Sequence, residues 1–374
     1  MSCQKKGNVL ILTNNIGGLH SFRKEVVKAI VDSGYDVYIS APDDDERVQF
    51  FEMINCHIIK TGFNRRGMNP FADFSLMTSY RRLIRHLTPK AVLTYTIKPN
   101  IYGGIACRIC RVPQIANVTG LGDAIENGGW LQKLTVFLYK TGIKKANTVF
   151  FQNSSNRDQC IELGIADNQS ILLPGSGVNL QHHVLQPYPA DDGKIRFLFI
   201  GRRLKDKGIE EYFDTARSIK AEYPNTEFQL LEPIVGGYEE EMEELMKDGI
   251  IKYLGTTTDV RPFIGSVECT IMPSYHEGMS NVNLESAANG RPVITTNVPG
   301  CRETVEDGVT GFLVEAHNSR SLTMAVERFI KMPYEQRVLM GQNARSKMEQ
   351  EFDRQIVVDA YIKELDLIMG YESL

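Results

Sequence analysis

The sequence predicts an α/β protein with two doubly wound domains that face a central cleft. A chain of 374 residues exceeds the size at which one hydrophobic core usually keeps growing. Short β-branched runs alternate with helix-length segments, and a Pro- and Gly-rich stretch without periodicity, 174–194, interrupts the alternation and is interpreted as a linker. Ligands of open α/β sheets bind where the strands end, so two such domains would line a cleft with their strand ends.

The first domain is expected at residues 1–180. Its strands are short runs rich in β-branched and other apolar residues, at 8–13, 36–40, 57–60, 91–95, 114–118 and 148–152. Helix-length segments separate these runs, which is typical of a parallel sheet covered by helices on both faces.

The second domain is expected at residues 181–355, where the alternation restarts. Its strands are predicted at 195–201, 228–231, 250–255, 269–273, 292–296 and 311–314. The chain is helical and amphipathic in pattern from about residue 318, and we expect a C-terminal helix at 356–374 that returns to the first domain.

Composition indicates a soluble globular protein of a reducing compartment. Hydrophobic residues make up 42% and charged residues 24%, close to average usage. Seven scattered cysteines do not form a disulfide framework, and the pair Cys107 and Cys110 has no second pair to complete a zinc site. Neither a membrane-spanning run nor a signal peptide is found, so a cytoplasmic location is expected.

Charge is divided unevenly between the halves. Residues 1–190 hold 21 Lys and Arg against 14 Asp and Glu, whereas 191–374 hold 21 against 32. The positive charge includes a stretch of arginines interleaved with apolar residues, namely Arg65, Arg66, Arg81, Arg82 and Arg85. Two interpretations are open: a surface for an anionic membrane or a phosphorylated partner, and an amphipathic helix packed on its own core with arginines in water.

Two glycines follow the first predicted strand. Gly17 and Gly18 precede a helix, so the backbone could approach a ligand and the helix start could offer N–H groups to an anion or a hydroxyl. The spacing is not the dinucleotide fingerprint GxGxxG, and a simple tight turn remains the alternative.

Basic residues cluster after the first strand of the second domain, in "GRRLKDKG". Arg202 and Lys207 stand where a clamp for phosphate is expected, and solvated side chains are the alternative. The aspartates at 43–45 are interpreted as a solvated turn and helix cap, because adjacent carboxylates repel one another unless an ion is bound.

The stretch "HEGMSNVNLESAANGRP" combines two carboxylates with a helix start. Ser280 is placed as an N-cap, and Gly290 ends the helix. The free N–H groups near 280–283 would attract a diphosphate, while Glu277 in the loop and Glu285 in the first turns would accept hydrogen bonds from sugar or ribose hydroxyls.

These motifs resemble those of the retaining GT-B glycosyltransferases of family 4 over essentially the whole chain. Glu277 and Glu285 match the family's two glutamates separated by seven residues, "GRRLKDKG" matches its phosphate clamp, and "GCRETVEDGVTGFLV" matches the segment that follows. One departure is Glu232 and Pro233, which stand where the family usually has a glycine.

The amino-terminal half is similar to a narrower group. "NPF" at 69–71, "TIKPNIYGGIA" at 96–106 and "TGLGDAI" at 119–125 resemble transferases that extend undecaprenyl-diphosphate-linked sugars, of the type that adds N-acetylgalactosamine to lipid-linked diacetylbacillosamine.

The resemblance implies roles for individual residues. Arg202 and Lys207 would neutralise the donor diphosphate, and Glu285 would hold the ribose. The sugar would be held by Glu277 together with the backbone of Gly278, Met279, Ser280 and Asn281. Gly17 and Gly18 would complete the donor site from the first domain. Neither a metal nor a cofactor is expected, because the leaving phosphate takes the acceptor proton and the cationic side chains stabilise its charge.

The expected function is therefore retaining transfer of a hexose or N-acetylhexosamine from a nucleotide sugar, UDP-linked, to a lipid-diphosphate-linked glycan in capsule, O-antigen or exopolysaccharide synthesis. The protein would lie peripherally on the anionic cytoplasmic face of the inner membrane, and no nucleic-acid partner is expected. The alternatives are a non-catalytic GT-B module that binds sugar nucleotide or glycan, and a nicotinamide-dependent enzyme, which the missing GxGxxG disfavours.

Overall fold

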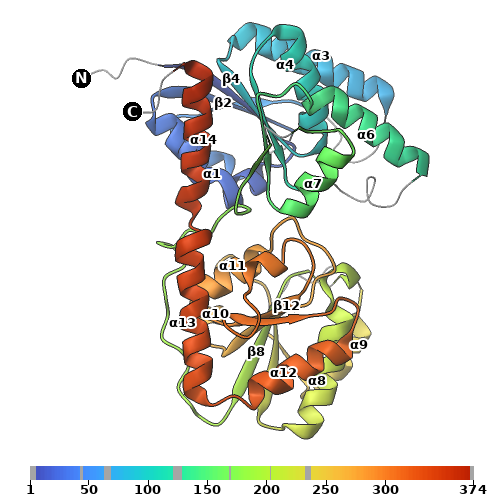
Figure 1. The fold of residues 1–374 in the computed structure, drawn as a ribbon, viewed down its shortest axis with the longest axis vertical. Helices are drawn as coiled ribbons and strands as arrows, with labels where there is room; N and C mark the ends of the chain where they lie inside the picture. Colours follow the sequence, from blue (N-terminus) through green and yellow to red (C-terminus); the bar gives the residue numbers. More distant parts are fainter. Residues whose placement is uncertain are drawn as a thin grey trace. The chain divides into compact units, whose positions relative to one another are not determined.

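The computed structural model describes residues 6–42, 45–62, 69–120, 129–167, 170–202, 204–231 and 237–370. The chain divides into two compact units (Figure 1). Unit 1 contains residues 1–176 and 355–374, and unit 2 contains 177–354. Each unit is built on one parallel sheet, which confirms the predicted pair of doubly wound α/β domains.

Unit 1 has a seven-stranded parallel sheet in the order β3-β2-β1-β4-β5-β6-β7. The central strands are buried on both faces, which explains their continuous apolar runs. The strands are β1 Gly7–Leu12, β2 Tyr35–Ala41, β3 His57–Lys60, β4 Ala91–Tyr95, β5 Gln114–Val118, β6 Thr148–Phe151 and β7 Ser170–Leu172.

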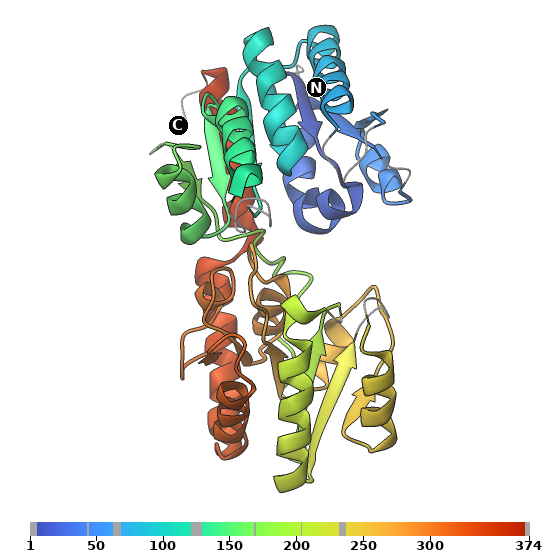
Figure 2. The same cartoon turned by 90° about the vertical axis from the view of Figure 1, so that its right-hand side faces the viewer.

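Helices cover both faces of this sheet. One face packs against α1, α2 and α14, and the other packs against α3, α4, α6 and α7; α3 and α4 lie side by side (Figure 2). Pro99–Gly103 forms a π-helical turn that runs into α4. The helices are α1 Ile16–Asp32, α2 Val48–Met53, α3 Pro70–Leu87, α4 Gly104–Cys110, α6 Gly129–Ile143, α7 Ser154–Glu162 and α14 Arg354–Met369.

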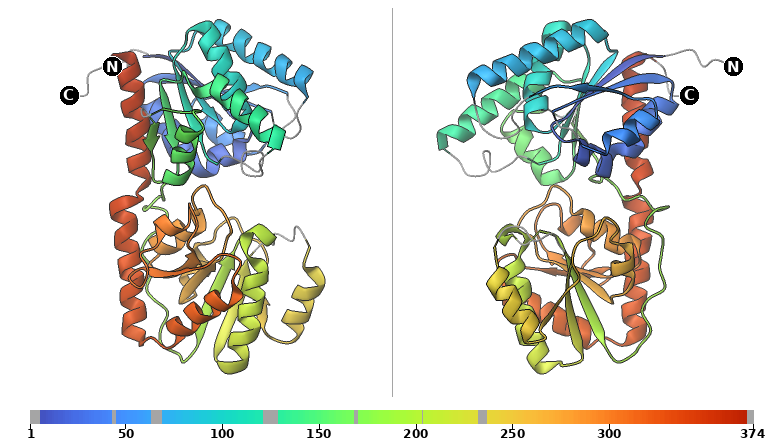
Figure 3. Two further views of the ribbon diagram at one scale, coloured as in Figure 1. Left: turned by 45° about the vertical axis from the view of Figure 1, so that its right-hand side comes forward. Right: turned by 180° about the vertical axis from the view of Figure 1, so that it is seen from behind.

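The C-terminal helix α14 is part of the core of unit 1 (Figure 3). Tyr361 is fully buried, its ring lies 4.7 Å from that of Phe150, and its hydroxyl hydrogen-bonds to Asn117 on β5. Thr148 on β6 donates a hydrogen bond to Glu364. These contacts join the last helix to the sheet strands β5 and β6.

Unit 2 has a six-stranded parallel sheet in the order β10-β9-β8-β11-β12-β13. One face packs against α8, α9 and α12, and α11 packs against α13 on the other side. Its strands are β8 Ile195–Ile200, β9 Thr226–Leu231, β10 Ile251–Tyr253, β11 Cys269–Met272, β12 Val293–Thr296 and β13 Gly311–Val314. Its helices are α8 Ile209–Glu222, α9 Glu239–Lys247, α10 Arg261–Gly265, α11 Asn281–Ala288, α12 Ser319–Ile330 and α13 Tyr334–Glu351, with 3-10 turns η2 Lys205–Lys207 and η3 Arg302–Thr304.

The segment expected as a linker is fastened to unit 2. The guanidinium of Arg291, which is fully buried, donates to six backbone carbonyls. These belong to Gln186, Pro187, Ile264, Gly265, Asn289 and Gly290. Residues 186 and 187 are therefore held against α10 and the end of α11.

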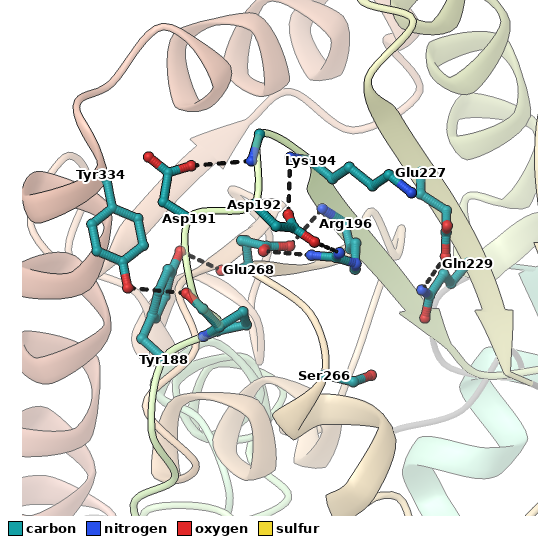
Figure 4. A network of polar contacts seen from close by, with 12 residues as sticks. Tyr188, Asp191, Asp192, Lys194, Arg196, Glu227, Gln229, Ser266, Glu268 and Tyr334 are labelled. Atoms are coloured by element: carbon teal, nitrogen blue, oxygen red, sulfur yellow. Dashed lines mark hydrogen bonds and ion pairs between the residues drawn. The ribbon is translucent and has the colours of Figure 1, made fainter.

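A second polar network lies at the edge of the sheet where β8 and β11 begin (Figure 4). Arg196 donates through its backbone and its side chain to Glu268, at 2.6 and 3.0 Å, and the side chain also pairs with Asp192. Tyr188 donates to the carbonyl of Glu268 at 2.8 Å. The network ties residues 188–192 to the edge of the sheet opposite the strand carboxyl ends.

Candidate active site

Two loops of unit 2 meet where β8 and β11 end. The N–H of Tyr275, after β11, donates to the carbonyl of Asp206, after β8, at 2.9 Å. Gly208 has φ +73°, and a Cβ there would lie 2.1 Å from the carbonyl oxygen of Pro273. Only glycine permits this close approach, which explains the Lys-Gly pair of the motif. The phenol of Tyr275 donates to Glu211 on α8 at 2.8 Å and fixes the second loop further.

These loops bring Lys207 and Glu277 together. The Lys207 Nζ lies 2.7 Å from the Glu277 Oε1, and the two side chains are 15% and 17% exposed. The Ser274 hydroxyl donates to the same oxygen at 3.0 Å. Among the described residues, both hydrogen bonds to this carboxylate end on Oε1. Oε2 is therefore available to accept a hydrogen bond from a ligand.

Helix α11 begins beside this pair, with Ser280 as its N-cap. The Ser280 hydroxyl accepts from the N–H of Asn283 at 3.4 Å, so the predicted cap is confirmed. The Ser280 N–H donates to the carbonyl of Gly300 at 2.8 Å. Gly300 has φ +81°, and a Cβ there would lie 2.4 Å from the carbonyl oxygen of Glu277. The loop 277–280 therefore packs against the backbone of Gly300. The first N–H groups of α11 follow this loop and have no hydrogen-bond partner within the helix.

A buried asparagine that the sequence analysis missed fixes the start of α11. Asn283 is fully buried, and its side chain donates to the hydroxyls of Thr295 at 3.2 Å and Thr304 at 3.0 Å. It therefore connects the first turn of α11 to β12 and to the 3-10 turn η3. The only sequence signal was an amide residue inside a predicted helix, which is an unfavourable position unless the side chain is bonded.

Glu285 lies in α11 and is largely removed from solvent. Burial raises the pKa of its carboxyl to about 7, against the lowering effect of the positive charge of Arg354. No described residue donates a hydrogen bond to this carboxylate, and none of the hydrogen bonds or ion pairs of the described chain joins it to Lys207 or Glu277. It is therefore an acceptor, largely removed from solvent, that has no hydrogen-bond donor among the described residues.

Arg202 follows β8 and is exposed. No hydrogen bond or ion pair links its guanidinium to another described residue, so it can pair with an anion. Its neighbour Arg203 lies outside the described residues, as do Glu232 and Pro233, where the sequence departs from the family pattern. In the described residues, no group of three His, Cys, Asp or Glu could hold a metal ion.

In unit 1, Gly17 and Gly18 form the first turn of α1. The side chain of Asn15 caps the helix and accepts from the N–H of Gly18 at 3.1 Å. A Cβ on Gly17 would lie 2.3 Å from the guanidinium of Arg47, which pairs with Asp45 at 2.6 Å. The hydrogen bond from Arg47 lowers the pKa of Asp45 to about 2. Arg47 was missed by the sequence analysis, because only the fold places it over the glycine.

The basic stretch is described in part. Arg65 and Arg66, and the aspartates 43 and 44, lie outside the described residues. Arg81, Arg82 and Arg85 lie on α3, which buries its apolar face while Arg82 and Arg85 stay exposed. None of the helices in the described part of the chain is long and apolar enough to cross a bilayer.

Comparison with known proteins identifies both units. Residues 9–153 match the family "Glycosyl transferase 4-like", and 194–332 match "Glycosyl transferases group 1". The chain is 25% identical to an N,N'-diacetylbacillosaminyl-diphospho-undecaprenol alpha-1,3-N-acetylgalactosaminyltransferase of Campylobacter jejuni, over 94% of this chain and 96% of that protein. It is 26% identical to the capsular polysaccharide biosynthesis glycosyltransferase CapM of Staphylococcus aureus, over 86% and 87%.

A solved structure shares the fold across nearly the whole chain. The Anabaena protein Alr3699/HepE, in complex with UDP and glucose, has a TM-score of 0.78 at 17% identity, covering 96% of this chain and 100% of that one. Family matches in both halves, full-length relatives and the shared fold agree, and the chain therefore belongs to the GT4-like glycosyltransferases with the GT-B fold.

Proposed function

We propose that this glycosyltransferase moves a hexose or N-acetylhexosamine from a UDP-sugar to a lipid-diphosphate-linked glycan, with retention of configuration. The Campylobacter relative is named for a diphospho-undecaprenol acceptor, and the Staphylococcus relative for capsular polysaccharide. The Anabaena protein of the same fold was solved with UDP-glucose. Capsule, O-antigen or exopolysaccharide assembly is the corresponding biological setting.

The pair Lys207 and Glu277 beside the start of α11 is the observation that carries the proposal. Lys207 has three donor hydrogens, so it can keep its bond to Glu277 and also donate to a phosphate oxygen. Arg202 supplies a second cation. The N–H groups of Met279 and Asn281 provide further donors, whereas the Ser280 N–H already binds the carbonyl of Gly300. Glu277 accepts from a sugar hydroxyl through Oε2, and Glu285 accepts from the ribose.

The chemistry requires stabilisation of the leaving diphosphate. The bond from the sugar C1 to the phosphate oxygen breaks, and a bond from C1 to the acceptor oxygen forms on the same face. The acceptor proton passes to the departing phosphate oxygen, so atoms and charge balance without a protein base. Arg202 and Lys207 stabilise the negative charge that develops on the diphosphate. The proposed reaction needs no metal.

Unit 1 receives the acceptor in this proposal, and its basic helix α3 lies against an anionic membrane surface. The exposed Arg82 and Arg85 attract anionic headgroups, as expected for a peripheral protein.

The test is UDP release by the full chain, measured with a panel of UDP-sugars, with and without membrane lipid extract, and with and without EDTA. We expect release that needs both one UDP-sugar and the lipid extract and that persists in EDTA. The anomeric configuration of the product, read by NMR, should equal that of the donor. Lack of turnover with every donor and extract would overturn the proposed substrates.

A further inference from the structure

A groove in unit 1 lies between α3, the turn from Pro99–Gly103 into α4, and α6. Its volume is about 350 Å³, within the range of small-molecule sites. Its walls are chiefly apolar side chains, among them Phe74, Met77, Ile97, Ile105, Leu134 and Leu138. Ile97 follows the end of β4, and Phe74 lies near the start of α3. The groove therefore opens at the strand carboxyl ends, the edge where open α/β sheets bind ligands.

The one acidic residue of the groove is fully engaged by neighbours. Asp73 is buried, and its Oδ1 accepts from Lys98 at 2.9 Å while its Oδ2 accepts from Tyr102 at 2.9 Å. The carboxylate thus has both oxygens occupied, and its negative charge is balanced by Lys98. An apolar chain bound in the groove would therefore not contact an unpaired carboxylate.

Large apolar side chains are exposed on the two helices that flank the groove. Phe71 is 88% exposed, Phe74 is 67%, Phe137 is 63% and Leu134 is 38%. Phe71 and Phe74 lie on α3, while Leu134 and Phe137 lie on α6, and Phe74 and Leu134 line the groove from its two sides. Apolar surface gathered in this way marks an interaction site rather than a scattered set of surface residues.

The two helices that flank the groove, α3 and α6, carry mostly positive charge. They hold five Lys and Arg residues, Arg81, Arg82, Arg85, Lys133 and Lys140, and one acidic residue, Asp73, whose charge Lys98 balances. A second copy of the chain would bring an equally positive face and be repelled. A basic peptide would be repelled in the same way. The fitting ligand is apolar in the groove and anionic beside it.

We infer that the groove holds the first isoprenoid units of the lipid-diphosphate acceptor, with the diphosphate bound by basic side chains of α3 and α6. The inference rests on the proposed function for its ligand. Beyond the proposed function, we infer that the enzyme takes part of the lipid chain out of the bilayer and binds it specifically. Each CH₂ group so buried strengthens binding, so affinity depends on the chain and not on the diphosphate alone.

The probe is farnesyl diphosphate, compared with inorganic diphosphate by isothermal titration calorimetry on the full chain. We expect farnesyl diphosphate to bind at least about tenfold more tightly. Met77→Glu, which places a charge in the groove, should remove this preference, lowering the affinity for farnesyl diphosphate much more than that for inorganic diphosphate. Phe74→Ser should weaken farnesyl diphosphate about tenfold, and it removes a ring that is mostly exposed, so the fold tolerates it.

Met53→Glu is the matched control. Met53 lies on α2 in the same unit, is 75% exposed and is not part of the groove lining. It should bind both probes like the wild type. The inference is overturned if the wild type binds the two probes with equal affinity, or if Met77→Glu still prefers farnesyl diphosphate as strongly as the wild type does. Either result would assign the exposed apolar side chains of α3 and α6 to general membrane contact.

A second assay separates this inference from the proposed function. In sugar transfer, the groove variants should raise KM for a long-chain lipid acceptor about tenfold or more and leave KM for the UDP-sugar donor unchanged. If the wild type transfers sugar to the lipid acceptor and the groove variants have the same KM for this acceptor, the inference about the groove is overturned and the proposed function stands. The wild type could instead transfer sugar to no lipid-diphosphate acceptor and still bind farnesyl diphosphate more tightly than diphosphate, with this preference lost in Met77→Glu. That result would overturn the proposed function and support the groove as a binding site for an isoprenoid chain.

Discussion

Lys207 and Glu277 are seventy positions apart in the chain, yet they form an ion pair of 2.7 Å where two neighbouring parallel strands end. β8 and β11 are adjacent in the sheet, so the loops that follow them meet at the same edge. The pair places a cation next to the helix start of α11 and leaves one oxygen of the glutamate available. The proposed donor chemistry can be tested from this arrangement.

Lys207→Ala should lower kcat/KM about 100- to 1000-fold, because it removes a charge that stabilises the leaving diphosphate. UDP release under saturating acceptor measures this loss. Lys205→Ala is the control, since Lys205 is 68% exposed, lies in the same 3-10 turn and pairs with Glu210 instead. Equal activity of the two variants would contradict the role of Lys207.

Ser280→Ala should raise KM for the donor and lower the free energy of unfolding by about 1 kcal/mol, because α11 loses its N-cap. Asn318→Ala removes the N-cap of α12, where Asn318 accepts from Ser321 at 2.9 Å. Both variants should lose similar stability in urea unfolding, whereas only Ser280→Ala should change KM. A parallel change of KM in Asn318→Ala would show that lost stability alone explains the effect.

Glu285 should make stability depend on pH. Its folded pKa of about 7 lies above the ordinary value of 4.5, so the folded state holds the proton more tightly. Its contribution is full below about pH 4.5 and is lost as pH rises through about 7. Glu285→Gln should therefore be more stable than wild type at pH 8, by roughly 1 to 3 kcal/mol.

Urea unfolding at pH 5 and pH 8 measures this difference. Glu243→Gln, at an exposed position on α9, serves as the control and should follow the wild type at both pH values. If Glu285→Gln and wild type lose the same stability between the two pH values, the carboxyl is not protonated in the folded protein as described.

Arg291→Met should destabilise unit 2 by about 3 kcal/mol or more, because six carbonyls lose a buried donor. Arg320→Met, at an exposed position on α12, is the control and should stay within about 0.5 kcal/mol of wild type. Chemical unfolding monitored by circular dichroism compares them. A small loss in Arg291→Met would mean that residues 186 and 187 do not depend on this guanidinium.

Replacing Arg81, Arg82 and Arg85 with Ser should release the protein from anionic vesicles, since each basic residue near such a surface contributes about 1 kcal/mol. Cosedimentation with phosphatidylglycerol vesicles measures binding, and neutral phosphatidylcholine vesicles provide the baseline. Arg320→Ser with Lys331→Ser in unit 2 is the charge control. Vesicle binding that survives the triple change would contradict the role of α3.

Much of the fold follows from local sequence. The strands at 91–95, 114–118 and 311–314 match the structure, because runs of apolar residues between helix-length segments have few alternatives. The strand β7, Ser170–Leu172, was missed, since three partly exposed residues at a sheet edge carry no clear pattern. The Pro- and Gly-rich segment was interpreted as a linker, and only the fold shows that Arg291 binds its residues 186 and 187.

The sequence by itself determined two α/β domains, the N-cap Ser280 and the candidate residues on either side of it, because hydrophobic periodicity and capping act within a few residues. Tertiary structure alone decided that Lys207 reaches Glu277, that Asn283 ties α11 to Thr295 and Thr304, and that Arg47 covers Gly17. These contacts join residues distant in the chain. They exist only once strand order has set which loops share an edge and packing has fixed where each side chain points.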